Sequence, residues 1–281
     1  MKIRIFLILA CIHFFKLTSV LAQEGSCGTY VTTEQMTLEN TINIPAVKSY
    51  ESLPQLDLEL MVTVYVVKDE TGTPGITNAA VVSALDRVNN AFSLIKVKFH
   101  ICAFNYIDNY QFNIINGARN ERDLLIQHYS TNTINLYFAS GLIDKFGSEV
   151  NGYALMPSEL KDAIFLRKDM VSSNEIIHQF GHFFNLYHTH ETAFGNEVVK
   201  NVNCDKTGDR CCDTPADPVI AGFVDNNCEY TGAFKDNNNQ FYIPSTQNFM
   251  SFGKDACRCT FTNDQYMRII YTINNLKKNL W

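Results

Sequence analysis

The sequence IHQFGHFFNLYHTHE, residues 177–191, contains four of the seven histidines of this 281-residue chain. Apolar residues at helical spacing before and within this stretch predict a helix that begins near Ser173. His178 and His182 are four residues apart and would share one face of that helix, with Cβ atoms roughly 5–6 Å apart. Two imidazoles placed in this way can bind one metal ion at about 2.1 Å.

His188 follows His182 by six residues, which is too far round a continuing helix to reach the same ion. A third ligand at His188 therefore requires a sharp turn. Asn185 is the natural place for this turn because asparagine, after glycine, best tolerates a left-handed backbone. The spacing of the three histidines is that of a metzincin zinc site. The alternative is an exposed, histidine-rich helix end.

Two pairs of residues have the spacing of a helix capping box, in which a hydroxyl precedes a carboxylate or amide by three residues. Ser172 and Glu175 would begin the histidine helix. Thr262 and Gln265 would begin a C-terminal helix that runs to about Lys277.

The segments before the histidine helix alternate between strand and helix patterns. The predicted strands are residues 58–67, 95–104, 134–139, 152–156 and 163–167, and the predicted helices are residues 77–94 and 119–129. We therefore expect an α/β (α+β) fold, with a twisted mixed sheet and two long helices in its upper subdomain.

Residues 1–22 have the pattern of a secretory signal peptide, because Lys2 and Arg4 precede an apolar run that ends in small residues. Lys16 interrupts the run short of the about 20 residues that a membrane span needs, so a membrane anchor is the weaker alternative. We predict a secreted protein. Beyond the signal peptide we expect a pro-segment or N-terminal extension, residues 23–56, and a main domain, residues 57–281.

The chain without its signal peptide is acidic. The signal peptide contains three of the 23 basic residues and no acidic residue, which leaves 20 basic against 29 acidic residues and a net charge of −9. Nucleic-acid binding needs a basic face, so we exclude a nucleic-acid partner.

Eight cysteines lie beyond the signal peptide, and an even number favours disulfides in an exported chain. Residues 195–244 are rich in glycine, aspartate, asparagine and proline. Few regular elements can form there, so we expect an irregular lower subdomain in which disulfides substitute for a core. Its candidate cysteines are Cys204, Cys211, Cys212, Cys228, Cys257 and Cys259.

Three further segments accompany the histidines: GDRCCDTPADP at 208–218, NFMSF at 248–252 and FTNDQYMR at 261–268. Together with HQFGHFFNLYHTH, they resemble the pappalysin family of metzincin zinc metallopeptidases. The resemblance covers about residues 57–281 and is firmest over residues 172–268.

The resemblance implies a metal centre and a peptide cleft. One zinc ion would be bound by His178, His182 and His188, and Met250 would form an apolar floor beneath it. A peptide or protein would bind in the adjoining cleft.

Two departures from the family pattern concern the chemistry. Gln179 stands where the family has the glutamate that accepts the proton of the zinc-bound water, and Phe252 stands where it has a tyrosine able to hydrogen-bond the oxyanion. General acid–base assistance is worth about 10² to 10⁴ in rate. Glu175 lies one helical turn, about 5.4 Å, from Gln179, too far to replace it. We therefore expect a catalytically impaired or inactive homologue that binds peptide or protein; the alternative is an active zinc metalloendopeptidase.

Cys27-Gly28-Thr29 resembles the cysteine switch of latent family members, in which a thiolate occupies the open position of the zinc ion. The alternative is a structural disulfide, for example with Cys102, which the even number of cysteines favours.

The family pattern also implies particular disulfides in the lower subdomain. These are Cys204–Cys228 and Cys212–Cys257, with Cys211 and Cys259 left as a third pair.

A calcium ion is a further implication of the resemblance. Asp209, Asp213, Asp217 and the carbonyl of Thr214 would hold it, whereas the alternative is a solvated acidic loop.

Overall fold

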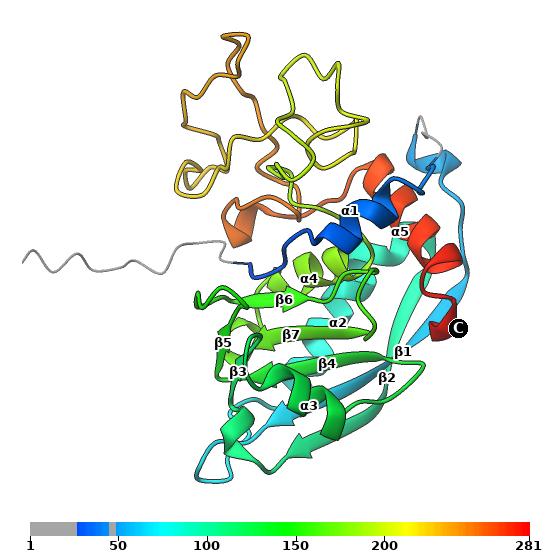
Figure 1. The fold of residues 1–281 in the computed structure, drawn as a ribbon, viewed down its shortest axis with the longest axis vertical. Coiled ribbons are helices and arrows are strands. Elements are labelled where there is room, and N and C mark those ends of the chain that lie inside the picture. Colours follow the sequence, from blue (N-terminus) through cyan, green and yellow to red (C-terminus); the bar gives the residue numbers. More distant parts are fainter. Residues whose placement is uncertain (1–26, 45–48) are drawn as a thin grey trace, which may run out of the picture.

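The computed structural model describes residues 27–44 and 49–281 (Figure 1), so the predicted signal peptide lies outside the described residues. The strands in this part of the chain are β1 (Leu58–Val67), β2 (Val97–Ile107), β3 (Ile114–Asn116), β4 (Ile134–Ala139), β5 (Gly141–Ile143), β6 (Gly152–Ala154) and β7 (Ala163–Arg167). The α-helices are α1 (Thr33–Glu39), α2 (Asn78–Phe92), α3 (Glu121–Gln127), α4 (Glu175–Phe183) and α5 (Asn263–Asn275).

A five-stranded sheet in the order β2-β1-β4-β7-β6 forms the centre of the fold. The pairs β1–β2, β1–β4 and β4–β7 are parallel, whereas the edge strand β6 runs antiparallel to β7. Strand β4 is buried at every position, as expected for a central strand covered on both faces. The predicted mixed sheet is confirmed, and its β6 edge packs against α4, the helix that carries the histidines.

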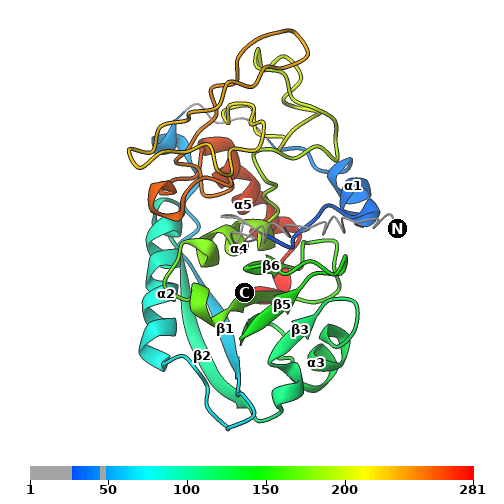
Figure 2. The ribbon, with the colours of Figure 1, turned by 90° about the vertical axis from the view of Figure 1, so that its left-hand side faces the viewer.

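Helices cover the two faces of the sheet, with α2 and α4 on one face and α3 on the other (Figure 2). On the first face, Phe92 of α2, Phe99 of β2 and Phe180 of α4 meet edge to face. This aromatic core fixes α4 against the sheet. The second face carries a stack of rings from Tyr65, Tyr137, Phe165 and Tyr153.

The N-terminus of α4 differs from the prediction. The helix begins at Glu175, and its cap residue Asn174 makes no capping hydrogen bond with its side chain, so the predicted capping box of Ser172 and Glu175 is wrong. The carboxylate of Asp255 instead accepts a hydrogen bond from the backbone N–H of Asn174 at 2.7 Å. The Glu175 side chain turns into the protein, where it is 3% exposed. The predicted capping box of Thr262 and Gln265 is confirmed at the start of α5.

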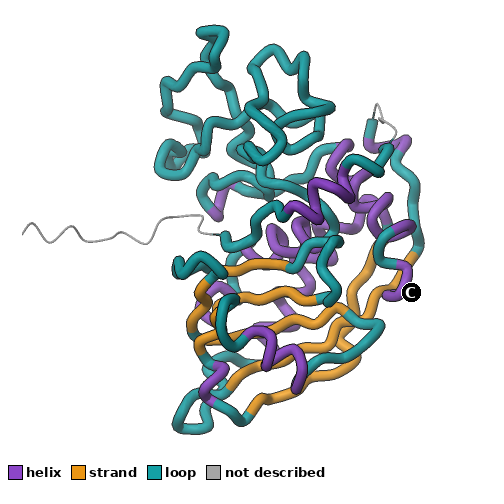
Figure 3. Tube along the Cα trace, viewed as in Figure 1, coloured by secondary structure: helices purple, strands orange, loops and turns teal. Residues whose placement is uncertain are grey.

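Between α4 and α5 the chain is almost entirely loop and turn (Figure 3), as the composition of this lower subdomain predicted. None of the described helices is long and apolar enough to cross a membrane.

Two disulfides hold the lower subdomain, but their pairing differs from the predicted one. The bonds are Cys204–Cys212 and Cys228–Cys257, with Cα atoms 5.0 Å and 5.5 Å apart, respectively. A turn in which the Asn203 carbonyl accepts from the N–H groups of Lys206 and Thr207 brings Cys212 back to its near neighbour Cys204.

The predicted third pair, Cys211 with Cys259, is not formed. Both cysteines are free; Cys211 is buried whereas Cys259 is exposed.

Candidate metal centre

Helix α4 and the turn after it bring three histidines together. His178 and His182 project from α4, which ends at Phe183. Asn185 has a φ of 73°, the left-handed conformation predicted for it, and this turn brings His188 back toward the helix. The Nε2 atom of His182 lies 3.0 Å from that of His178 and 3.1 Å from that of His188.

Backbone carbonyls orient the two helix histidines. The Nδ1 of His178 lies 2.7 Å from the Phe249 carbonyl, and the Nδ1 of His182 lies 2.8 Å from the Leu186 carbonyl. Each Nδ1 therefore donates a proton, and each Nε2 keeps its lone pair for a metal. Burial lowers the pKa of all three imidazoles, that of His182 to about 3. Neutral imidazole is the form that binds a metal.

The spacing of these nitrogens fits a zinc ion. Two nitrogens bound to zinc at 2.0–2.1 Å in tetrahedral geometry lie roughly 3.3–3.4 Å apart, close to the distances of 3.0 Å and 3.1 Å. The Sγ of Cys27 joins the group, and the four ligand atoms all lie within 4.8 Å of one another. Within residues 27–44 and 49–281, these four residues form the group of histidine, cysteine or acidic side chains that lie close enough together to hold a metal ion.

Met250 packs against α4 close to the histidines and is fully buried. A Cβ added at Gly181 would lie 2.4 Å from its Sδ, so the absence of a side chain there lets the methionine approach the helix. The carbonyl of Met250 accepts from the N–H of Thr189, the residue after His188. Met250 thus supports both the helix and the returning segment.

Gln179 is buried beside the histidines and bonds in two directions. Its Nε2 donates to Glu175 at 2.7 Å and to the Sγ of Cys27 at 3.2 Å, while its Oε1 accepts from the Thr29 hydroxyl at 3.3 Å. Burial raises the pKa of Glu175, although Arg258, 3.5 Å away, opposes this effect. Gln179 therefore presents an N–H group, and not a proton acceptor, to the position of a fourth ligand.

Phe252 packs beside the histidine cluster. Its ring centroid is 4.8 Å from that of His188 and 6.2 Å from that of His178. His190 stacks on His188 and also contacts Phe252 at 4.4 Å. The side chain at position 252 thus gives the site an apolar wall where a phenol would offer a hydrogen bond.

Cys27 is not joined to Cys102, because both thiols are free. The alternative of a disulfide between them is therefore wrong. Cys102 is exposed on β2, whereas Cys27 faces the histidines. Burial raises the pKa of the Cys27 thiol to about 12, and the negative charge of Glu175 adds to the shift.

The segment around Cys27 extends along the edge of the sheet. Cys27 forms a parallel bridge with Gly152 of β6, and the N–H of Gly28 donates to the Gly152 carbonyl at 2.9 Å. The Thr29 hydroxyl then accepts from the Ala154 N–H at 2.9 Å. Residues 27–29 thereby occupy the backbone edge that β6 would otherwise offer to an extended peptide.

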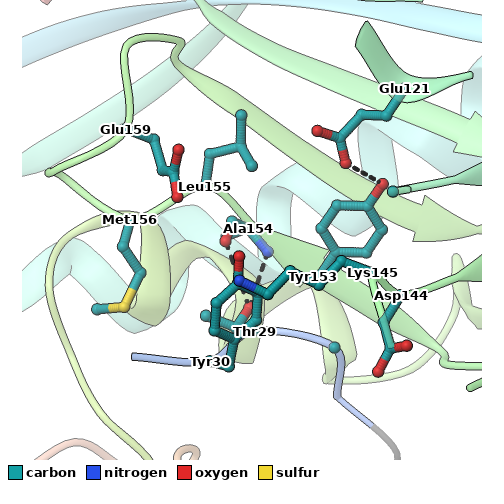
Figure 4. A pocket seen from close by; sticks show the side chains of 12 residues that line it. Thr29, Tyr30, Glu121, Asp144, Lys145, Tyr153, Ala154, Leu155, Met156 and Glu159 are labelled. Carbon is teal, nitrogen blue, oxygen red and sulfur yellow. Dashed lines mark hydrogen bonds between the residues drawn. The ribbon is translucent and has the colours of Figure 1, made fainter. Parts of the chain in front are cut away.

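Thr29 and Tyr30 also line a cavity of about 110 Å³ (Figure 4). Farther along its wall, the Tyr153 hydroxyl donates to Glu121 at 2.7 Å. The ammonium group of Lys145 lies over the Tyr30 ring, 3.2 Å from its centroid. The cation–π contact ties the N-terminal segment to the loop after β5.

Helix α1 anchors the same segment. Glu39 is 2% exposed, and its two carboxylate oxygens accept from the Arg268 guanidinium at 2.7 Å and 2.9 Å. Gln35 is also buried, and its Nε2 donates to Asn185 at 2.6 Å and to Tyr187 at 2.9 Å. Sequence reasoning missed these contacts because residues 23–56 lack periodicity and the partners lie up to 229 positions away.

The structure does not support the predicted calcium site. Asp209 accepts from the Thr214 hydroxyl at 2.8 Å, Asp217 bonds to Thr189, and Asp213 is exposed. Asp209 and Asp217 thus accept from hydroxyls and Asp213 from the backbone N–H of Asp264, and among the described residues the three carboxylates do not form a group close enough to hold one ion.

Glu197 was also missed by sequence reasoning and lies near this acidic loop. Within the described part of the chain, both of its carboxylate oxygens are buried without a hydrogen-bond partner. Burial, followed by the charges of Asp209 and Asp217, raises the pKa of Glu197 to about 8. Gly208 makes room for the carboxylate, since a Cβ there would lie 2.2 Å from Glu197 Oε2.

The raised pKa of Glu197 predicts a pH-dependent stability. The folded pKa of Glu197 lies above its unfolded value of about 4.3. The protonated carboxyl therefore contributes its full stabilisation of the folded protein below about pH 4.3, and this stabilisation is lost as pH rises through about 8. Thermal unfolding between about pH 5 and pH 9 should therefore show a steeper loss of stability for the wild type than for Glu197→Gln. Exposed Glu229→Gln is the control, and parallel curves for all three proteins would contradict the prediction.

The histidine triad, the methionine behind it and the mixed sheet together define a metzincin-type zinc metallopeptidase domain. The family model described as pregnancy-associated plasma protein-A, peptidase family M43, matches residues 133–274. The chain therefore belongs to this pappalysin family.

Solved structures show the same fold. Mirolysin in complex with compound 9 has a TM-score of 0.55 and 15% identity, covering 81% of this chain and 96% of that one. Mature mirolysin of Tannerella forsythia in complex with a cleaved peptide has a TM-score of 0.54 and 16% identity, with the same coverage. No curated protein matches the sequence.

Proposed function

We propose that the protein is a secreted, zinc-binding member of the pappalysin family that is catalytically impaired or inactive and binds peptide or protein segments in the cleft beside its metal centre. The observation that carries the proposal is the amide of Gln179, which directs an N–H toward the fourth ligand position. The predicted signal peptide at residues 1–22 supports secretion.

The chemistry follows from the side chains at two positions. Zinc lowers the pKa of a bound water to about 7. Peptide hydrolysis also needs a group that takes the proton and passes it to the leaving amine. Gln179 can do neither, and Phe252 offers no hydrogen bond to an oxyanion. The ligands His178, His182 and His188 are retained, so the expected outcome is metal binding without efficient hydrolysis.

A peptide-binding role is supported by the way the edge strand β6, beside the metal centre, pairs with an extended segment. An extended segment can pair with β6, as residues 27–29 do in this chain. The similarly folded mirolysin has been solved with a cleaved peptide.

Metal content and activity, measured on the same sample, test the proposal. We expect about one zinc per chain, bound through three histidines as in other zinc sites of this class. His182→Ala should lose most of this metal, whereas His100→Ala, on strand β2, should keep it. Zinc-loaded protein, with and without Cys27→Ser to open the fourth position, should cleave a peptide library no faster than the metal-free control.

An active zinc metalloendopeptidase is the second candidate, and the complete histidine triad of a peptidase family favours it. Zinc-dependent turnover that His182→Ala abolishes would decide for this candidate. Absence of zinc from the wild type would contradict both.

A further inference from the structure

Two stretches of the lower subdomain repeat one sequence pattern. Residues 223–230 read FVDNNCEY and residues 234–241 read FKDNNNQF. In register, each stretch has a phenylalanine, an aspartate two positions later, two asparagines and a second aromatic residue. Both lie in the loops at the top of Figure 1.

The two stretches fold into the same hairpin. In each, the aspartate N–H donates to the carbonyl four positions on, and its Oδ1 accepts from the backbone N–H groups two and four positions on. The residue three positions after the aspartate has a left-handed backbone, with a φ of 63° at Cys228 and 61° at Asn239. The residue before each aspartate pairs with the second aromatic residue. The sequence repeat therefore forms two copies of one structural unit.

The paired hairpins expose aromatic rings and uncharged amides. Phe223 and Phe234, at equivalent positions, pack edge to face with ring centroids 4.9 Å apart, yet they remain 38% and 42% exposed. Near the tips, the side chains of Asn227, Asn237 and Asn238 are exposed and have no hydrogen-bond partner among the described residues. Both aspartate carboxylates, by contrast, are engaged by backbone N–H groups of their own turns.

These groups fit a neutral ligand rich in hydroxyl groups. An amide both donates and accepts hydrogen bonds, as a hydroxyl does. An aromatic ring offers a flat apolar surface against which the C–H face of a sugar ring can pack. The acidic character of the chain disfavours a sulfated or otherwise acidic polymer.

The duplication adds a second constraint on the ligand. A polymer of identical units can engage both hairpins at once, because each hairpin offers the same phenylalanine and the same amides. Joining two weak contacts on one chain raises the affinity without any new kind of contact. A polysaccharide satisfies this constraint.

We propose that residues 223–241 form a binding site for a neutral polysaccharide. Phe223 and Phe234 pack against sugar rings, and the amides at the hairpin tips hydrogen-bond to sugar hydroxyls. The site uses none of the metal-centre residues, so the inference goes beyond the proposed function and its test is independent of zinc.

Native-gel affinity electrophoresis of the full chain tests the proposal. Gels that contain hydroxyethylcellulose, glycol chitin, xylan, glucomannan or glycogen should retard the wild type in at least one case. Phe223→Ala and Phe234→Ala should each weaken this interaction by about 3- to 10-fold, the usual effect of losing one aromatic contact. Tyr110→Ala is the matched control, since it removes an exposed ring outside the hairpins and should leave the retardation unchanged.

A second variant does not disturb the packed rings. Asn237→Ala combined with Asn238→Ala removes two exposed amides and should also weaken binding to the retarding polysaccharide. The disaccharide of that polysaccharide should compete at least about 10-fold less well, per sugar unit, than its hexasaccharide, because only the longer chain can engage both hairpins.

Three outcomes would overturn the inference. The first is no retardation by any of these polymers, and the second is equal retardation of the wild type and all the hairpin variants. The third is a peptide or protein that binds the wild type and is lost from Phe234→Ala, which would make the surface polypeptide-binding. Metal-free protein and His182→Ala should bind the polysaccharide as the wild type does, so failure of this inference leaves the proposed function standing, and the reverse also holds.

Discussion

Replacing Gln179 with glutamate and Phe252 with tyrosine, in a Cys27→Ser background, should raise zinc-dependent peptide cleavage by about 10² to 10⁴ or more. A carboxylate at position 179 supplies the general base, which alone is worth about 10² to 10⁴ in rate. A phenol at position 252 adds a donor for the oxyanion, and loss of one such donor typically costs about 10² to 10³. The measurement is the initial rate on a peptide library, compared with the metal-free form of the same variant.

The contact with Glu175 gives this variant a recognisable pH profile. Two adjacent carboxylates resist joint ionisation, so the pKa of the new glutamate should be raised and cleavage should increase toward alkaline pH. Cys27→Ser alone is the matched control for opening the fourth position. A triple variant that holds a full complement of zinc and still cleaves no faster than Cys27→Ser would show that the site is damaged at another position.

Replacing Glu39 with glutamine should reduce the free energy of unfolding by about 3–5 kcal/mol, the usual effect of removing one partner of a buried ion pair. Glutamine has no charge and only one acceptor oxygen, so Arg268 would lose its counter-charge, and the hydrogen bonds that Arg268 and Tyr187 now donate to two carboxylate oxygens could not all be kept. Urea unfolding of wild type and variant measures the difference. Glu34→Gln lies on the same helix and is exposed, so it should change the stability little.

The effect of Glu39 should also depend on pH in a defined direction. Burial alone would raise its pKa, but Arg268 and the hydroxyl of Tyr187 bring it below the ordinary value. A lowered folded pKa contributes stability above the unfolded pKa of about 4.3, and that stability is lost as pH falls through the folded value. The gap between wild type and Glu39→Gln should therefore be largest near neutral pH and shrink below about pH 4. A gap that does not change with pH would argue against the ion pair as its source.

The histidine triad could be predicted because the positions of its ligands depend on helix geometry and one turn within a short segment. Ligands four residues apart on a helix need no tertiary information to share a face, and the third ligand required a turn that Asn185 can make. The strands β1, β4 and β7 were also predictable, since their apolar, β-rich sequences match their burial. The family resemblance then identified the position of Met250.

Other features could not be predicted because they depend on distant partners. The Ser172 and Glu175 spacing suggested a capping box, but the carboxylate is drawn inward by Gln179 and Arg258. The disulfides follow the path of turns in an irregular loop, which cysteine spacing does not encode. Glu197 and Glu39 are acidic residues in unpatterned segments, and their burial becomes evident only when the chain is folded.

The hydrogen bond from Gln35 to Asn185 links the N-terminal segment to the turn after helix α4. Asn185 forms the turn that delivers His188 to the other histidines, so an N-terminal segment that steadies this turn also steadies the third ligand. Thermodynamic reciprocity then requires that metal uptake tighten the hold on residues 27–39 by the same factor by which those residues tighten the hold on the metal. A change in metal concentration would therefore also change the fraction of molecules in which residues 27–39 leave the cleft open.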